Sequence, residues 1–195
     1  MRKTGLFGGT FDPIHYGHLL AAEAAREAAK LEEVWFIPTF APPHKANPGA
    51  DAETRRRMLE IALEETPGFR VEDLELRRQG VSYTIDTVNA LLERYPDRSF
   101  YWIVGSDMVK DLPNWRDSER LAELVTFIGL DRPDDPFGEA ELPMYVRRKL
   151  LRASMPPMGL SSTDIRRRVK DGRSIRFMTP DPVCDWIRRN GLYGS

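Results

Sequence analysis

Short apolar runs alternate along the chain with longer segments whose apolar side chains recur every three or four residues. The apolar runs lie at 3–7, 34–37, 100–104 and 125–128. Two of them, 34–37 and 100–104, consist of aliphatic and aromatic residues alone, which is typical of strands that are buried on both faces of a parallel sheet. Because strand and helix signals alternate, we predict an α/β fold: a parallel sheet with helices on its faces.

The predicted helices are marked by apolar spacing and by residues that favour helix ends. An alanine-rich helix is expected over 16–30, and Asp51 is expected to cap the next one. Further helices should begin after Ser82-Tyr83-Thr84, surround Leu121 and cover 182–189.

Four more segments complete the predicted order of elements. Residues 69–76 alternate between apolar and polar side chains and are expected to form a strand. We expect a helix over 145–153 and a short strand at 158–160. The proline-rich, acidic segment 131–143 is expected to be an exposed loop.

Composition narrows the class of protein. With 195 residues, 41% of them hydrophobic, the chain is long enough for one domain with a sizeable core. The net charge of -1 shows no basic excess that would indicate nucleic acid. The single cysteine, Cys184, excludes an internal disulfide and a cysteine zinc cluster, and we interpret it as a buried thiol in a reducing compartment. No signal peptide and no apolar run of about 20 residues is visible, so we expect a cytoplasmic protein without a membrane span.

The segment 8–18 lies between the first predicted strand and the first predicted helix. Gly8 and Gly9 allow the backbone to approach a ligand closely, and a helix N-terminus offers unpaired N–H groups to a phosphate. His15 and His18 are three residues apart and share one face of a helix. This arrangement predicts an anion site, although it matches neither the dinucleotide fingerprint nor the P-loop.

The three histidines of the chain, His15, His18 and His44, all lie in loops that follow predicted strands. Imidazoles in such a cluster can bind phosphate or a metal ion. The metal interpretation is disfavoured because the glutamate of the H-E-x-x-H motif is missing. The positive charge of Lys45, in the second loop, also argues against a bound cation.

A second candidate anion site lies at 161–166. Ser161 and Asp164 match a capping box, which needs no ligand. A capping box does not require arginine, however, and Arg166 beside helix N-terminal amides would attract an anion. Arg167 and Arg168 are expected to be solvated, as are the arginines at 55–57.

Two further residues, Asp107 and Trp115, each allow more than one role. Asp107, after the strand at 100–104, could serve a ribose hydroxyl, a magnesium ion or a helix cap. Trp115 could offer its flat face to a planar ring or lie at the edge of the core. Two phosphate sites without a candidate nucleophile or general base indicate polyphosphate chemistry by positioning and charge neutralisation.

Two segments in this order, 8–18 and 161–166, resemble the first and the second signature of the nucleotidylyltransferase superfamily. Ile14-His15-Tyr16-Gly17-His18 is similar to its H-x-G-H motif, and Ser161-Ser162-Thr163-Asp164-Ile165-Arg166 resembles its I-S-S-T-x-x-R motif, with Leu160 in the place of isoleucine. Four interior segments look like the bacterial nicotinate-nucleotide adenylyltransferases: Ile37-Pro38-x-x-x-Pro42-Pro43-His44-Lys45, Ser82-Tyr83-Thr84-x-Asp86-Thr87, Gly105-Ser106-Asp107 and Leu112-x-x-Trp115. The segment 183–193, which ends in Asn190-Gly191-Leu192-Tyr193, also resembles the C-terminal part of that family. The segment 131–142 matches no pattern of that family.

The resemblance implies a fold, a reaction and a cofactor. The fold would be a Rossmann-like, doubly wound parallel sheet in a single domain, 1–195, with a small C-terminal helical part at about 160–195. ATP and nicotinate mononucleotide would give nicotinate adenine dinucleotide and pyrophosphate, with magnesium, in NAD biosynthesis. The mononucleotide phosphate would attack the α-phosphorus of ATP directly, and no nucleophile of the enzyme would be used.

The resemblance also implies roles for individual residues. His15, His18 and Arg166 would be catalytic. Contacts to ATP and its phosphates would come from Gly8, Gly9, Thr10, Phe11, His15, His18, Gly105, Asp107, Ser161, Ser162 and Arg166. Contacts to the mononucleotide would come from Thr10, His44, Lys45, Tyr83, Thr84, Asp107 and Trp115. No residue is assigned to a protein-bound metal.

Two other classes of function compete with this interpretation. A metal-dependent hydrolase would use all three histidines, and a nucleotide- or RNA-binding module would rest on the arginines at 55–57 and 166–168. The sequence also leaves open a monomer or a homodimer. The preference for nicotinate over nicotinamide mononucleotide stays open as well, since no lysine or arginine closely flanks Ser82-Tyr83-Thr84 except Arg77 and Arg78.

Overall fold

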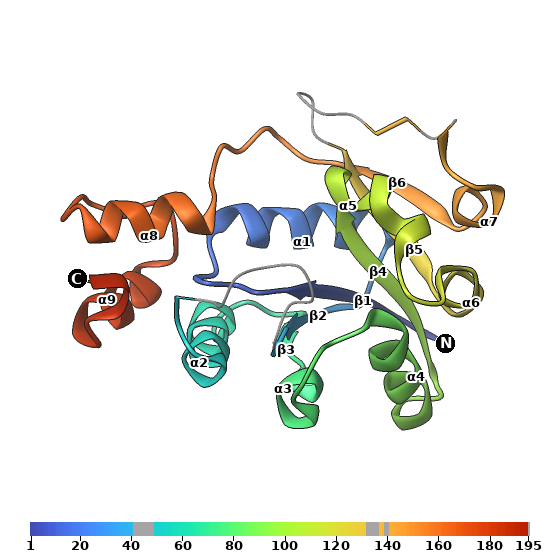
Figure 1. Cartoon of the computed structure of the whole chain (residues 1–195), viewed down its shortest axis with the longest axis horizontal. Helices are drawn as coiled ribbons and strands as arrows, with labels where there is room; N and C mark the ends of the chain where they lie inside the picture. Colours follow the sequence, from blue (N-terminus) through green and yellow to red (C-terminus); the bar gives the residue numbers. More distant parts are fainter. Residues whose placement is uncertain (41–48, 132–136, 139–140, 195) are drawn as a thin grey trace.

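A computed structural model gives the arrangement of the chain (Figure 1). It describes residues 1–40, 49–131, 137–138 and 141–194. One sheet of six strands has the order β3-β2-β1-β4-β5-β6, and every neighbouring pair is parallel. The strands are β1 (Arg2–Gly9), β2 (Glu33–Pro38), β3 (Phe69–Val71), β4 (Arg98–Gly105), β5 (Thr126–Asp131) and β6 (Leu150–Ser154). The predicted Rossmann-like, doubly wound sheet is confirmed.

Helices cover both faces of this sheet. They are α1 (Tyr16–Ala29), α2 (Ala52–Leu63), α3 (Leu74–Arg78), α4 (Thr84–Arg94), α5 (Ser106–Asp111), η1 (Leu112–Asn114), α6 (Ser118–Leu124), α7 (Met144–Arg147), α8 (Ser162–Lys170), α9 (Asp181–Arg189) and η3 (Leu192–Gly194). One apolar core includes side chains of α1, α2, α8 and α9, and a second includes α4, α5, α6 and α7. In Figure 1, α8 and α9 lie at one end of the molecule, beside the beginning of α1. No helix in the described part of the chain is long and apolar enough to cross a membrane.

The continuous apolar run in β2 follows from its position inside the sheet. Val34 and Phe36 point into the first core, whereas Trp35 and Ile37 point into the second. Because successive side chains of a strand face opposite sides, a strand covered on both faces has no position that favours a polar residue.

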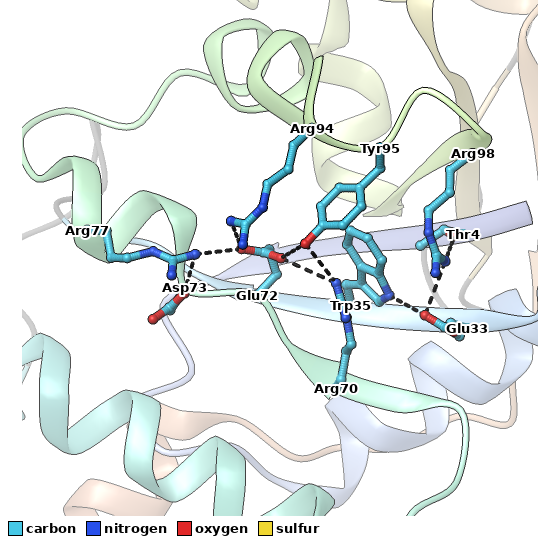
Figure 2. Close-up of polar contacts among 10 residues, drawn as sticks. All are labelled: Thr4, Glu33, Trp35, Arg70, Glu72, Asp73, Arg77, Arg94, Tyr95 and Arg98. Atoms are coloured by element: carbon cyan, nitrogen blue, oxygen red, sulfur yellow. Dashed lines mark hydrogen bonds and ion pairs between the residues drawn. The ribbon is translucent and has the colours of Figure 1, made fainter. Parts of the chain in front are cut away.

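Polar contacts join the amino ends of β1, β2 and β4 (Figure 2). Glu33 accepts hydrogen bonds from Trp35 Nε1 at 2.7 Å and from Arg98 at 3.2 Å, and Arg98 also donates to Thr4 at 2.8 Å. The guanidinium groups of Arg70 and Arg98 lie 3.7 and 4.7 Å from the centre of the Trp35 ring. These contacts fix the end of the sheet that lies opposite the carboxyl ends of the strands.

The predicted strand over 69–76 is wrong in its second half, where the chain turns into α3. Strand β3 ends at Val71, and the carboxylate of the next residue, Glu72, is buried and accepts hydrogen bonds from Arg70 and Arg77 (Figure 2). Tyr95 donates a further hydrogen bond to the same carboxylate at 3.4 Å. The alternation of apolar and polar residues therefore continues past the point at which sheet pairing stops.

The predicted elements at 145–153 and 158–160 are also wrong. Helix α7 ends at Arg147, and the following residues form β6, the edge strand that pairs with β5. No strand forms at 158–160, where the described chain is irregular. Short apolar runs fit both periodicities, and here pairing with the exposed edge of β5 determines the outcome.

The segment 131–143 is not wholly an exposed loop. Among its described residues, Phe137 and Leu142 are buried, with exposed fractions of 1% and 6%. A Cβ at Gly129 would lie 2.6 Å from the Phe137 ring, so this glycine makes room for the phenylalanine. Residues 132–136 and 139–140 lie outside the described residues.

Cys184, predicted to be buried, is only partly buried. Its Sγ lies 3.6 Å from the Thr179 carbonyl oxygen and 3.7 Å from that of Ile175. Burial raises the pKa of the thiol, and the nearby carboxylates of α9 add to this effect. The thiol is therefore kept in its less reactive, protonated form.

Candidate functional site

The candidate site lies where the strand order reverses, between β1 and β4, at their carboxyl ends. Open α/β sheets bind ligands in the crevice at this switch point. Gly8 and Gly9 end β1, and Gly105 ends β4 and precedes the exposed Asp107. The fold therefore brings four of the predicted ligand-binding residues to one edge of the sheet.

Gly8 and Gly9, at the carboxyl end of β1, are required by packing. A Cβ at Gly8 would lie 2.9 Å from the ring of Trp102, and one at Gly9 would lie 2.8 Å from the ring of Phe11. Phe11 has a φ of 49°, which is uncommon for a residue other than glycine, and its buried ring packs against Phe36. The glycines therefore make room for two aromatic rings, that of Trp102 on the neighbouring strand β4 and that of Phe11 in the loop after β1.

His15 and His18 lie face to face at the beginning of α1. Their rings stack at 3.7 Å between centroids and at 22° between planes, and His15 is only 5% exposed. A Cβ at Gly17 would lie 3.0 Å from the His15 ring, which explains the glycine between the histidines. The backbone N–H of His15 donates to His18 Nδ1 at 3.3 Å, so the proton of the neutral His18 ring lies on Nε2. His18 can therefore donate a hydrogen bond from Nε2.

The carboxylate of Asp12, in the loop before α1, accepts hydrogen bonds from two other parts of the chain. It is buried and accepts hydrogen bonds from the backbone N–H groups of Gly49 at 2.6 Å and Ala50 at 3.2 Å. The Tyr193 hydroxyl donates a third hydrogen bond at 2.6 Å, and burial raises the pKa of that hydroxyl. One carboxylate thus joins the first signature, the segment before α2 and the C-terminal turn.

The second signature is directly bonded to the first. Arg166 Nη1 donates to the Asp12 carbonyl at 2.7 Å and lies 3.7 Å from its carboxylate. Ser162 Oγ donates to the Pro13 carbonyl at 2.9 Å. Ser161 caps α8 by accepting from the Asp164 N–H at 3.1 Å, so half of the predicted capping box is present. The cap and the contacts of Arg166 therefore coexist.

Arg55, expected to be solvated, is buried with an exposed fraction of 1%. Its guanidinium donates to the carbonyl oxygens of Thr10 at 2.8 Å, Phe40 at 3.3 Å and Ala50 at 3.3 Å. Burial lowers the pKa of this group, and the charge of Asp12 opposes the shift. The spacing along α2 could have indicated this burial, because Arg55 lies on the same helical face as the inward residues at 58, 59 and 62.

Trp115 and Tyr83 lie on a second part of the site. The Trp115 indole is partly buried, meets Trp102 edge-on at 6.5 Å and lines a hollow of about 500 Å³. Tyr83 precedes the first residue of α4, Thr84. The guanidinium of Arg116, which sequence analysis missed, lies 4.7 Å from the centre of the Tyr83 ring. This contact connects the beginning of α4 with the segment that carries Trp115.

A buried carboxylate, also missed, supports the beginning of α4. Glu75 is 4% exposed and accepts a hydrogen bond from the buried Thr87 hydroxyl at 2.7 Å. Burial raises the pKa of Glu75, and the hydrogen bond from Thr87 opposes the shift. The fold therefore favours the protonated form of this side chain.

The variant Glu75→Gln is expected to change the pH dependence of stability. Below pH 4.5, the ordinary pKa of a glutamate side chain, Glu75 is protonated in both the folded and the unfolded state. Its burial then carries no cost from the loss of a hydrated charge. As the pH rises above 4.5 towards the raised pKa of the folded state, the unfolded state ionises first and the natural protein loses stability. In urea titrations the variant should gain stability over the natural protein at pH 8 but not at pH 4. A matched change at the exposed Glu123 should show no such difference, and a pH-independent effect of Glu75→Gln would contradict this account.

His44 and Lys45 lie outside the described residues. Within the described ranges, no three histidine, cysteine, aspartate or glutamate side chains form a group that could hold a metal ion.

Comparisons with known proteins agree with this geometry. The model of the cytidylyltransferase-like family matches residues 6–168. A protein of Oceanobacillus iheyensis named "Probable nicotinate-nucleotide adenylyltransferase" is 43% identical over 194 residues, covering 100% of this chain and 98% of its own. A Thermus thermophilus protein of the same name is 44% identical over 191 residues, covering 98% and 99%.

Two solved structures share the fold. The Plasmodium falciparum nicotinic acid mononucleotide adenylyltransferase complexed with NaAD has a TM-score of 0.82 at 22% identity and covers 99% of this chain and 98% of its own. The same enzyme complexed with APC has a TM-score of 0.79 at 20% identity, with coverage of 99% and 98%.

Proposed function

This chain belongs to the cytidylyltransferase-like family and, within it, to the nicotinate-nucleotide adenylyltransferases, and we infer that it joins ATP and nicotinate mononucleotide in NAD biosynthesis. The products are nicotinate adenine dinucleotide and pyrophosphate. One observation of the structure supports this function most: the two signatures, distant in sequence, are hydrogen-bonded to each other at the ligand-binding edge of the sheet.

The proposed reaction is one in-line displacement. An oxygen of the mononucleotide phosphate forms a bond to the α-phosphorus of ATP. The bond from that phosphorus to the oxygen bridging to the β-phosphorus breaks, and pyrophosphate leaves with the electron pair. The chain supplies position and charge, because such a displacement needs no nucleophile or general base from the protein.

On the ATP side, we assign the phosphates to the loop between β1 and α1. His18 Nε2 donates to a phosphate oxygen, while His15, buried behind it, fixes the ring by stacking. The backbone of Gly8-Gly9-Thr10-Phe11 is assigned to offer N–H groups. In the first turn of α1 the N–H groups of Tyr16 and His18 already donate to the carbonyl oxygens of Met178 and His15, so the contribution of this turn is assigned to Gly17. Arg166 has a side chain that is 32% exposed, and its guanidinium is assigned to the leaving pyrophosphate, with Ser161 and Ser162 beside it.

On the mononucleotide side, we assign the pyridine ring to the face of Trp115. Backbone amides at Tyr83 and Thr84 receive the ring carboxylate, because the beginning of α4 favours negative charge. His44 and Lys45 are assigned to the mononucleotide phosphate. Asp107, together with Gly105 at the end of β4, faces the ribose or base.

We propose that magnesium arrives with ATP. The carboxylate of Asp12 already accepts three hydrogen bonds, so it is a poor ligand, whereas Asp107 is exposed at the same edge of the sheet. Magnesium is commonly held by one or two carboxylates together with substrate phosphates, which fits such a sparse donor set. When bound, the ion neutralises phosphate charge. We further propose that the chain acts as a single cytoplasmic domain.

Release of pyrophosphate tests this function. The purified protein is mixed with ATP, magnesium and, in parallel, nicotinate mononucleotide, nicotinamide mononucleotide or phosphopantetheine. Nicotinate mononucleotide should give pyrophosphate and an equal amount of the dinucleotide. Turnover with phosphopantetheine alone, or with neither pyridine nucleotide, would overturn the assignment, and stoichiometric tightly bound zinc would favour the hydrolase.

The variant Trp115→Ala is expected to raise the KM for nicotinate mononucleotide about tenfold, because a stacked aromatic contact to a base is worth about 1–3 kcal/mol. The KM for ATP should stay within about twofold. Trp186→Ala is a matched control, since it removes a partly buried indole from α9. An equal rise in both KM values would contradict the placement of the pyridine ring.

A further inference from the structure

Arg116 brings a positive charge to the part of the site assigned to the pyridine ring. Its side chain is 54% exposed, and its guanidinium lies 4.7 Å from the centre of the Tyr83 ring. It immediately follows Trp115 in the sequence, and Tyr83 immediately precedes Thr84. The guanidinium therefore lies against the segment whose amides are assigned to the ring carboxylate, on the residue next to the tryptophan assigned to the ring.

Two carboxylates flank Arg116 without holding it tightly. Asp86 lies 3.9 Å and Asp117 4.0 Å from its nitrogen atoms, at the limit of an ion pair. Other exposed arginines of the chain have shorter pairs, such as Arg188 with Asp185 at 2.8 Å. A ligand carboxylate at ordinary hydrogen-bond distance would approach the Arg116 guanidinium more closely than either aspartate does.

The arginines nearest to Thr84 in the sequence bond to other side chains. Arg77 pairs with Asp73 at 2.8 Å and with the buried Glu72 at 3.2 Å. Arg78 donates to the Thr87 hydroxyl at 3.2 Å. The cation that the fold brings against Tyr83 thus comes from a later segment, which sequence proximity does not reveal.

The charge of Arg116 matters because the two candidate mononucleotides differ in one group. Nicotinate carries a carboxylate on the ring, and nicotinamide carries a neutral carboxamide. Backbone N–H groups can bond to an oxygen of either group, so they discriminate weakly. A cation beside that position attracts the carboxylate and gains little from the carboxamide.

We propose that Arg116 is a specificity-determining residue that favours nicotinate mononucleotide over nicotinamide mononucleotide through charge. The inference rests on the proposed function, which supplies the position of the ring. Tyr83 acts as a positioning residue, because its ring supports the guanidinium.

The test compares kcat/KM for the two mononucleotides in the natural protein, Arg116→Gln and Arg116→Lys. The ratio of acid to amide should fall about fivefold in Arg116→Gln, the effect of one charge contact at a half-exposed position, and kcat/KM should fall more for the acid than for the amide. Arg116→Lys should keep most of the preference. Arg188→Gln is the matched control, because Arg188 lies in α9, outside the hollow lined by Trp115, is 75% exposed and pairs with Asp185.

Two further measurements separate this inference from its premise. Raising the salt concentration should lower the ratio in the natural protein and leave it unchanged in Arg116→Gln. Calorimetric binding of each mononucleotide without ATP reports the preference independently of the reaction. An unchanged ratio in Arg116→Gln, or an equal loss for both mononucleotides, would overturn the inference. A binding preference that depends on Arg116 without formation of dinucleotide would instead overturn the proposed reaction.

Discussion

Replacing His18 by alanine is expected to lower kcat for dinucleotide formation by about 10²–10³-fold, the usual effect of losing one preorganised donor to a developing negative charge. The donor is Nε2, because Nδ1 accepts from the His15 backbone N–H at 3.3 Å. The KM for ATP should change much less than kcat, since the contact strengthens as charge moves onto the leaving pyrophosphate.

The stability of the same variant shows how much of the role of His18 is that of a helix cap. Its ring packs edge-on against Phe11 at 5.1 Å and stacks on His15, so some stability should be lost. We expect a loss of about 1 kcal/mol in urea unfolding, the typical effect of a removed cap. Loss of activity that simply matches loss of folded protein would contradict a role of His18 in the reaction.

Replacing Asp12 by alanine is expected to destabilise the fold by about 3–5 kcal/mol, the usual cost of leaving a buried charge without its partner. The buried guanidinium of Arg55 would lose its nearby negative charge. The N–H groups of Gly49 and Ala50 and the hydroxyl of Tyr193 would lose their acceptor. Urea unfolding monitored by circular dichroism measures the loss.

Tyr193→Phe is the matched comparison for Asp12→Ala. It removes one hydrogen-bond donor to the carboxylate and keeps the ring, so the expected loss of stability is about 1 kcal/mol. If Asp12→Ala destabilises the protein no more than Tyr193→Phe does, the carboxylate does not hold these segments together.

Much of the fold could be predicted from sequence because local signals agree with the tertiary environment. The runs at 34–37 and 100–104 are apolar on both faces, and both are inner strands of the sheet. The segments at 69–76 and 145–153 were mispredicted because their apolar spacing fits a strand and a helix equally. Their outcome depends on partners elsewhere in the chain: the edge of β5 for β6, and the arginines around Glu72 where β3 ends.

The site divides in the same way. His15, His18, Ser161 and Arg166 could be selected as candidates because short spacings and helix-end chemistry mark them. The hydrogen bond between Asp12 and Tyr193 joins residues 181 positions apart, and no local pattern announces such a contact. Charged residues that act through long-range contacts are therefore the part of a site that sequence analysis misses most readily.

Following isotope from one substrate to the products tests the central claim most directly. Nicotinate mononucleotide carrying oxygen-18 in the three non-bridging oxygens of its phosphate is incubated with ATP and the protein, and both products are analysed by mass spectrometry. Direct attack on the α-phosphorus predicts that all of the label enters the dinucleotide and that pyrophosphate carries none. Label in pyrophosphate, or AMP and pyrophosphate formed without any dinucleotide, would contradict it.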